Sequence, residues 1–148
     1  MRNKQWFLSQ AILLFLILFS PFRIELFSLS GIRYLGLFFF IIGGVLALYA
    51  VLSLKDNLKP SPKPRIGGHL VTFGLYSIVR HPAYSGILLA ALGVSLWIND
   101  LIRLLLTLGL FVFFDAKSSV EERWLEKVYP EYGNYKKRIT KKFIPWIY

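Results

Sequence analysis

The chain has 148 residues, 55% of them hydrophobic, and carries a formal net charge of +10. A mean hydropathy of +0.54 is too apolar for an ordinary soluble domain and predicts an all-α, polytopic membrane protein of one domain. The absence of cysteine excludes disulfides, a thiolate nucleophile and a Cys-ligated metal. With only two histidines, His69 and His81, no metal site is expected. The positive charge flanks apolar runs, so membrane orientation explains it better than nucleic acid binding.

Two apolar segments near the N-terminus, residues 6–22 and 32–54, predict the first two transmembrane helices. The first follows Arg2 and Lys4 but ends without a small-x-small cleavage site, so we expect a retained helix rather than a cleaved signal peptide. The second is long enough to cross roughly 30 Å of hydrocarbon with some tilt. Residues 1–54 therefore form a two-helix N-terminal part.

Two further apolar segments, residues 83–98 and 101–114, are short for full spans. Only Asn99 and Asp100 separate them, which predicts a tight helical hairpin. The fourth helix is expected to continue past the membrane surface through residues 115–128. The fold prediction is thus about four transmembrane helices followed by a C-terminal tail.

The connecting loop and the tail have their own patterns. Residues 55–80 carry prolines at alternate positions, which prevent a helix and favour an extended path. In the tail, the run YPEYGNYKKR predicts a short surface helix. The final Pro145, Trp146, Ile147 and Tyr148 predict an interfacial anchor, because Trp and Tyr favour the headgroup level.

Charge predicts the orientation in the membrane. Of the 18 Lys and Arg residues, 15 lie in the N-terminus, the loop 55–80 or the tail after residue 114. By the positive-inside rule, both termini and the Arg80-His81 region face the cytoplasm, in a multi-pass protein of the cytoplasmic or inner membrane. The opposite side keeps three basic residues, Arg23, Arg33 and Arg103.

A first polar group lies at the start of the third helix. Pro82 suits the first helical turn, where its missing N–H costs nothing. The amides of residues 83–85 would then be unpaired, and with Arg80 and His81 they predict an anion-binding corner. Aromatic faces that attract a cationic or planar ligand come from Tyr76 and Tyr84.

A second polar group, Lys117, Glu121 and Glu122, lies at the end of the fourth helix. Lys117 and Glu121 are four residues apart and share a helix face. In a hairpin, both groups lie at the cytoplasmic end, where opposite poles suit a zwitterionic, amino-acid-like ligand. Taken singly, each feature also has a plainer interpretation, such as Arg80 touching lipid phosphate or a solvated acidic helix face.

The run LVTFGLYSIVRHPAYSG, residues 70–86, resembles a known signature. It is similar to the segment L-V-T-x-G-x-Y-x-x-x-R-H-P-x-Y-x-G of the isoprenylcysteine carboxyl methyltransferase family, membrane methyltransferases related to the phospholipid methyltransferases. The Glu121-Glu122 pair with the following Leu125, the tail tyrosines and Pro145 also fit. The resemblance covers residues 54–145, and the first two helices match in hydropathy only.

The resemblance implies a methyltransferase whose core, residues 55–148, binds S-adenosylmethionine near the cytoplasmic surface. Lys117 stands where the eukaryotic enzymes have an Arg that is thought to face the substrate. Lys keeps the charge but loses the bidentate fork of Arg. Carried over by position, the cofactor-binding residues are Leu70, Val71, Tyr76, His81, Pro82, Ala83, Tyr84 and Glu121.

Roles follow from the charges of the cofactor. Arg80 and His81 are predicted to bind its carboxylate, and Glu121 its ammonium. A carboxylate acceptor needs no base, whereas an amine acceptor would lose a proton to Glu122. The predicted catalytic residues are Arg80, Lys117 and Glu122.

The predicted function is methyl transfer from S-adenosylmethionine to a lipid-like or membrane-embedded acceptor, with a carboxylate favoured. Expected partners are membrane lipid and a lipophilic small-molecule or prenylated substrate. The alternatives are a phospholipid or amine N-methyltransferase, an NADPH-dependent membrane sterol-type reductase, and a non-enzymatic membrane scaffold. The reductase segment R-H-P-N-Y-x-G differs from this chain at Ala83 and is followed by an acidic residue, where Ile87 stands here. The identity of the acceptor stays open.

Overall fold

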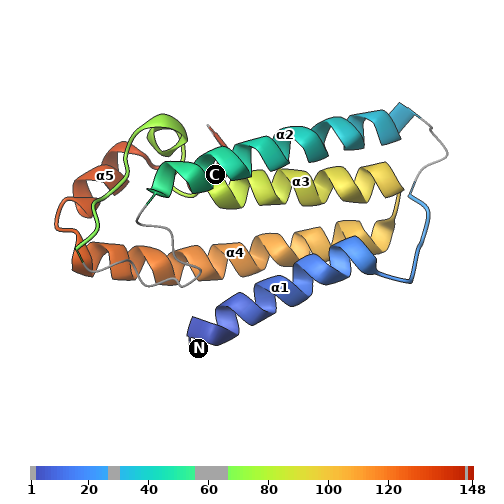
Figure 1. Ribbon diagram of the computed structural model, residues 1–148, viewed down its shortest axis with the longest axis horizontal. Helices are drawn as coiled ribbons and strands as arrows, with labels where there is room; N and C mark the ends of the chain where they lie inside the picture. The colour runs from blue at the N-terminus through green and yellow to red at the C-terminus, as the bar shows by residue number, and fades with distance from the viewer. Residues whose placement is uncertain (1–2, 27–30, 56–66, 146) are drawn as a thin grey trace.

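The computed structural model describes residues 3–26, 31–55, 67–145 and 147–148. Within these ranges the chain is helical and forms no strand, which confirms the all-α prediction (Figure 1). The elements in chain order are α1 (Asn3–Phe19), α2 (Gly31–Leu54), the short 3-10 helix η2 (Gly74–Ser77), α3 (Pro82–Ile98), α4 (Leu101–Val128) and α5 (Tyr132–Arg138).

The predicted boundaries are close to the observed ones, with one shift. The first helix was expected over residues 6–22, but α1 ends at Phe19. Pro21 explains the early end, because a proline restricts the residue before it to non-helical conformations. α4 is one continuous helix to Val128, as predicted. Most of the proline-rich loop, residues 56–66, lies outside the described residues.

The turn between α3 and α4 confirms the predicted hairpin. Asn99 ends α3 in the left-handed region with a φ of 60°, a conformation that Asn tolerates better than most residues. Asp100 then caps α4, because its side chain accepts a hydrogen bond from the backbone N–H of Ile102. Two residues are therefore sufficient to reverse the chain.

Successive helices run in opposite directions along one long axis (Figure 1). α2 packs along α3 through glycines that bring the two backbones together. A Cβ atom at Gly43 would lie 2.3 Å from the backbone N of Ala90, and one at Gly86 would lie 2.4 Å from the backbone N of Ala47. Small residues at such positions are typical of helix packing in membranes. α1 packs on α4 and α3.

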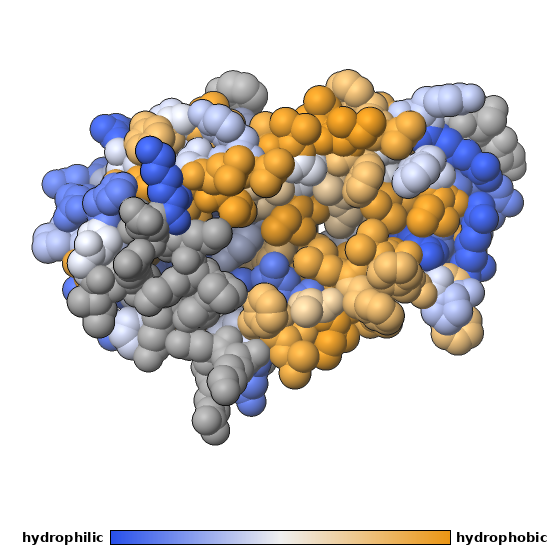
Figure 2. All heavy atoms as spheres, in the orientation of Figure 1, coloured by the Kyte–Doolittle hydropathy of each residue, from blue (hydrophilic) through white to orange (hydrophobic). Residues whose placement is uncertain are grey.

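On the face that Figure 2 shows, apolar residues cover much of the middle of the bundle, and hydrophilic residues gather toward both ends. Among the described residues, α2 is the one helix that is both long and apolar enough to cross a membrane. Only 17% of its most apolar window is buried inside the structure, so α2 directs apolar side chains outward. The apolar helices α1 and α3 are shorter.

Candidate functional site

The structure brings the two predicted polar groups together at one end of the α3–α4 hairpin. The Nε atom of Arg80, just before α3, donates a hydrogen bond to Oε1 of Glu122 on α4 at 2.8 Å. The Nε2 atom of His81 lies 3.1 Å from the same oxygen. All three side chains are buried. We call Arg80, His81, Tyr84, Glu121 and Glu122 the polar site.

The partners of Glu122 decide its charge. Burial alone would raise the pKa of this carboxyl, but hydrogen bonds from His81 and Arg80, together with their charge, lower it from 4.5 to about 2. Lys136 of α5 adds a contact at 3.1 Å to the other oxygen, Oε2. Glu122 is therefore ionised and engaged at neutral pH. A carboxylate with so low a pKa is a weak base, so the geometry favours a positioning role.

Glu121 is the more accessible carboxylate of the polar site. Its side chain is 28% exposed, whereas that of Glu122 is 5% exposed. Its Oε2 atom accepts a hydrogen bond from the hydroxyl of Tyr84 at 2.8 Å and lies 4.0 Å from Nδ1 of His81. The Tyr84 ring stacks on the rings of His81 and Phe114, with centroid distances of 5.5 and 4.5 Å. This stack fixes the Tyr84 hydroxyl against Glu121.

Lys117 lies one turn earlier on α4 and is 5% exposed. Its Nζ atom donates a hydrogen bond to Oε1 of Gln10 on α1 at 2.5 Å and lies 5.1 Å from the centre of the Tyr84 ring. Burial lowers the pKa of Lys117, against the opposing effect of the Glu121 charge. The sequence analysis did not identify Gln10. Its signal is a polar residue in a helix that is otherwise apolar from Trp6 to Phe19 except for Ser9.

The apolar residues predicted for the cofactor lie in two clusters beside the polar site. Val71 and Tyr76 pack with Ala50 of α2, and Ala83 of α3 packs against them. Leu70 packs against three tyrosines of the tail. These tyrosines are Tyr129, Tyr132 and Tyr135.

The tail helix α5 falls within the segment predicted to be helical, but its tyrosines are not on the surface. Tyr132 and Tyr135 are 1% and 5% exposed. The hydroxyl of Tyr135 donates to the backbone carbonyl of Tyr76 at 2.7 Å, which ties the tail to the loop before α3. The hydroxyl of Tyr132 is buried without a hydrogen-bond partner among the described groups.

The prediction of unpaired amides at the start of α3 is wrong for two of the three residues. The backbone N–H groups of Tyr84 and Ser85 both donate to the carbonyl of His81 at 3.1 Å. The tail also covers this end, since the N–H groups of Arg80 and His81 donate to the carbonyls of residues 141 and 142. Pairing within the first turn and with the tail satisfies groups that local sequence leaves open.

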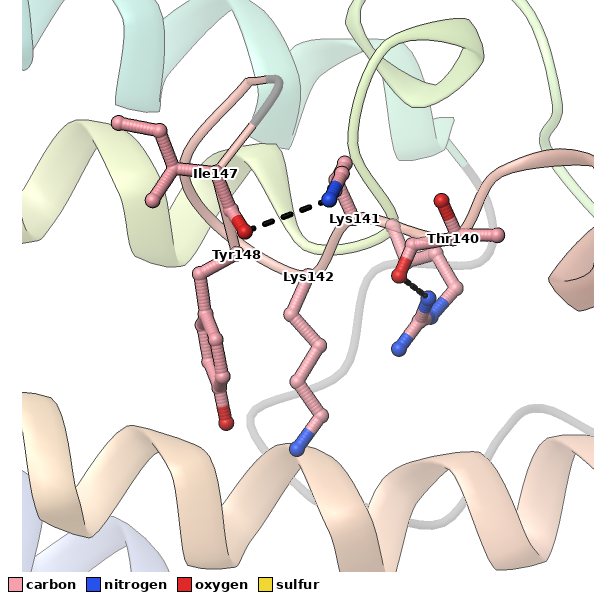
Figure 3. Close-up of a pocket in the computed structure, with 6 residues that line it drawn as sticks. Thr140, Lys141, Lys142, Ile147 and Tyr148 are labelled. Atoms are coloured by element: carbon pink, nitrogen blue, oxygen red, sulfur yellow. Dashed lines mark hydrogen bonds between the residues drawn. The ribbon is translucent and has the colours of Figure 1, made fainter.

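The tail forms an open basic cavity next to the polar site (Figure 3). Its volume is about 340 Å³. Lys142 also binds Oδ1 of Asp115 on α4 at 2.5 Å, and the hydroxyl of Tyr148 donates to the same oxygen at 2.7 Å. The predicted anchor segment thus folds back on α4 through Tyr148, and Trp146 lies outside the described residues. The lining residues are Arg80, Thr140, Lys141, Lys142, Ile147 and Tyr148.

Comparison with known proteins identifies the class. A family model described as phospholipid methyltransferase matches residues 32–132. The chain therefore belongs to the phospholipid methyltransferase family.

Particular relatives refine this assignment. The chain is 31% identical over 112 residues to a probable protein-S-isoprenylcysteine O-methyltransferase of Oryza sativa subsp. indica, covering 73% of this chain and 59% of the relative. It is 36% identical over 72 residues to the protein-S-isoprenylcysteine O-methyltransferase of Schizosaccharomyces pombe, covering 47% of this chain and 30% of that protein. The predicted relationship with isoprenylcysteine carboxyl methyltransferases is confirmed.

A solved structure shows the same fold. The eukaryotic intramembrane Ras methyltransferase, an isoprenylcysteine carboxyl methyltransferase, superposes with a TM-score of 0.72 at 26% identity. The match covers 97% of this chain and 52% of that protein. The chain thus spans about half the length of the relative, and the fold of nearly all its residues is shared.

Proposed function

We propose that the chain is a multi-pass membrane methyltransferase that transfers a methyl group from S-adenosylmethionine to a carboxylate on a lipid-like acceptor. The observation that carries this proposal is the polar site. An accessible carboxylate, Glu121, lies beside stacked aromatic rings and a buried cation, at the end of an apolar helical bundle. The named activities of the relatives from rice and fission yeast support the same reaction class.

The donor set at the polar site fits a zwitterionic cofactor. Glu121 offers a half-buried carboxylate for the ammonium group, and Tyr84 offers an aromatic face. Arg80 would hold the carboxylate, because it lines the basic cavity while binding Glu122. The Tyr132 hydroxyl, which has no hydrogen-bond partner within the described ranges of the chain, is a further group that a ligand can satisfy.

The predicted cofactor contacts of the loop and of α3 remain part of the proposal. Leu70, Val71, Pro82 and Ala83 would supply the apolar wall, while Tyr76 and His81 would close it. When bound, S-adenosylmethionine supplies a methyl group that is already activated on a sulfonium. The residues of the chain then need only position the acceptor and exclude water.

The low pKa of Glu122 favours a carboxylate acceptor. A carboxylate is deprotonated at neutral pH and attacks without a base, whereas an amine must first lose a proton. Glu122 is too weak a base for that step and is held by Arg80 and His81. Lys117, buried and without a carboxylate partner within the described part of the chain, would bind the acceptor. Amine methylation is the second candidate, and the family description supports it.

We further propose four membrane crossings, with the polar site on the cytoplasmic side. The alternating directions of α1 to α4 support this topology (Figure 1). The predominance of basic residues in the termini and the loop 55–80 supports the orientation. A cofactor would then enter from the cytoplasm and a lipophilic acceptor from the bilayer.

Titration of the purified protein with S-adenosylhomocysteine tests the cofactor site. We expect Glu121→Gln to weaken binding about tenfold to a hundredfold, because it removes a charge-assisted hydrogen bond. Glu126→Gln is the matched control, since Glu126 lies on the same helix, is 43% exposed and pairs with Lys136. Its affinity should stay within about twofold of the wild type.

The same titration discriminates between the candidate functions. Equal binding by wild type, Glu121→Gln and His81→Ala would refute the site, and no binding at all would favour the scaffold or the reductase. Transfer of a labelled methyl group into a membrane extract then identifies the acceptor type. A base-labile ester indicates a carboxylate, and a stable methylamine indicates an amine.

A further inference from the structure

Lys117 is a buried cation whose partner carries no charge. Its side chain is 5% exposed, and its Nζ atom donates to the amide oxygen of Gln10 at 2.5 Å. The Tyr84 ring lies 5.1 Å away. The Glu121 charge, one turn further along α4, acts on Lys117 from beyond ion-pair distance. Among the described residues, no carboxylate oxygen lies within 4 Å of this nitrogen.

This arrangement is unusual, because a charged group taken out of water is normally paired with an opposite charge. The ammonium group has three N–H donors, and Gln10 accepts a hydrogen bond from one of them. The neighbouring cations are paired with carboxylates in the usual way, since Arg80 is bound to Glu122 and Lys142 to Asp115. Lys117 therefore has donors and charge left for an anionic ligand.

Gln10 reaches this position because of its place on α1. It lies one turn after Trp6, which is 8% exposed and contacts the ring of Phe113 on α4 at 5.4 Å. It lies two turns before Ile17, which is buried in the core shared with α4. Gln10 is therefore on the face of α1 that packs against α4. A glutamate there would neutralise Lys117, whereas the amide holds the ammonium in place and leaves its charge available.

We propose that Gln10 is a positioning residue that holds the Lys117 ammonium against Tyr84 without a carboxylate at ion-pair distance, so that it binds the carboxylate of a lipophilic ligand. The identification of this ligand with the methyl acceptor rests on the proposed function. Gln10 thus contributes from α1 to a site whose other groups come from α3 and α4. The Lys117 ammonium, held by Gln10, would bind a ligand with a free carboxylate more tightly than a neutral analogue of the same shape.

The test compares an acid with its own ester. The probes are N-acetyl-S-farnesylcysteine, with a free carboxylate, and its methyl ester, each titrated into purified protein in detergent. We expect the wild type to bind the acid at least about tenfold more tightly than the ester, the value of one charge-assisted hydrogen bond. Gln10→Glu should abolish this preference, because the new carboxylate occupies the ammonium.

Two further variants separate positioning from a general effect on folding. Gln10→Met removes the hydrogen bond without adding charge and should reduce the preference to about threefold. Gln5→Glu is the matched control, since it places the same new charge at an exposed position of α1, and it should keep the wild-type preference. A merely structural Gln10 would change the unfolding temperature of its variants and leave the acid-to-ester ratio unchanged.

The outcomes for the inference and for the proposed function are separable. An acid preference that survives Gln10→Glu, or its absence from the wild type, overturns the role of Gln10 and Lys117. Binding of S-adenosylhomocysteine, measured on the same preparations, reports on the proposed function. If that binding fails while the acid preference follows Gln10, the anion site stands and the methyltransferase does not.

Discussion

The two ends of the α3–α4 hairpin each contain a buried ion pair between arginine and a carboxylate. At the turn end, which we call the clamp, Arg103 pairs with Asp100. The guanidinium also donates to the backbone carbonyls of Ile17 and Ser20, each at 2.9 Å. Asp100 accepts from the N–H of Ile24 at 3.0 Å. The clamp thus ties the end of α1 and the segment after it to the hairpin turn.

The polar site contains the same kind of ion pair, but polar groups around the pair can still bind a ligand. Arg80 and Glu122 are engaged, as in the clamp. Beside them, however, Glu121 is partly exposed, Lys117 has a neutral partner and the Tyr132 hydroxyl has no partner within the part of the chain that the structure describes. A buried ion pair therefore does not by itself distinguish function from structure. The polar groups left over around it make the difference.

Breaking the clamp should have the largest effect on stability. Arg103→Ala leaves Asp100 buried and unpaired, so we expect a loss of about 3–5 kcal/mol in the free energy of unfolding. Binding of S-adenosylhomocysteine by the folded fraction should stay unchanged. Denaturation in detergent, followed by tryptophan fluorescence, measures the loss.

A double variant serves as the control for the clamp. Arg103→Met with Asp100→Asn removes both charges and keeps the acceptor that caps α4, so most of the stability should return. A single variant within about 1 kcal/mol of the wild type would mean that the clamp is not structural.

Acid should weaken the polar site in a defined range. The folded pKa of Glu122, about 2, lies below the ordinary value of 4.5. The contribution of ionised Glu122 to the stability of the fold is therefore fully present above pH 4.5 and is lost as the pH falls through about 2. The free energy of unfolding should fall by roughly 3 kcal/mol over this range. Unfolding measured across this range should show a smaller dependence on pH in Glu122→Gln. Identical acid profiles of the two proteins would contradict the assigned ionisation.

The packing of α2 on α3 should have the smallest of the three effects. Gly43→Ala places a Cβ atom 2.3 Å from a backbone nitrogen of α3, so we expect a loss of about 1–3 kcal/mol. A Cβ atom at Gly44 would have no other atom within 4 Å, so Gly44→Ala should be neutral or stabilising by up to about 1 kcal/mol. Chemical denaturation of both variants measures the difference, and equal effects would rule out the close approach.

Gly43→Ala also probes the link between α2 and the polar site. Tyr76 hydrogen-bonds the carbonyl of Ala50 near the end of α2. A shift of α2 should therefore weaken binding of S-adenosylhomocysteine. The clamp should keep its stability, because its hydrogen bonds run to Ile17, Ser20 and Ile24.

Much of the local structure followed from the sequence. Pro82 predicts a helix start, and the short link of Asn99 and Asp100 predicts a tight turn, because these preferences act within a few residues. The continuous apolar pattern predicted α2. The boundary of α1 was missed because the apolar run continues past Pro21 to Phe22, where hydropathy outweighed the proline.

The candidate site was predicted in part. The hairpin brings residues on either side of its turn together, so the meeting of Arg80 and His81 with the acidic pair was foreseeable. Their partners were not. The sequence suggested open amides at the start of α3, but those of Tyr84 and Ser85 donate to the His81 carbonyl. It did not indicate that Glu122 binds the Arg80 guanidinium. Such pairing depends on distances between segments that sequence does not specify.

Composition, apolar periodicity and one dense motif were enough to determine a helical membrane protein, its hairpin and its family. Only the tertiary structure decided that Arg103 belongs to a structural clamp and that Gln10 of α1 faces Lys117, 107 residues away. The physical reason is the range of the forces involved. Helix formation and capping act between near neighbours, whereas the charge on a buried side chain depends on whichever distant groups the fold places within about 4 Å.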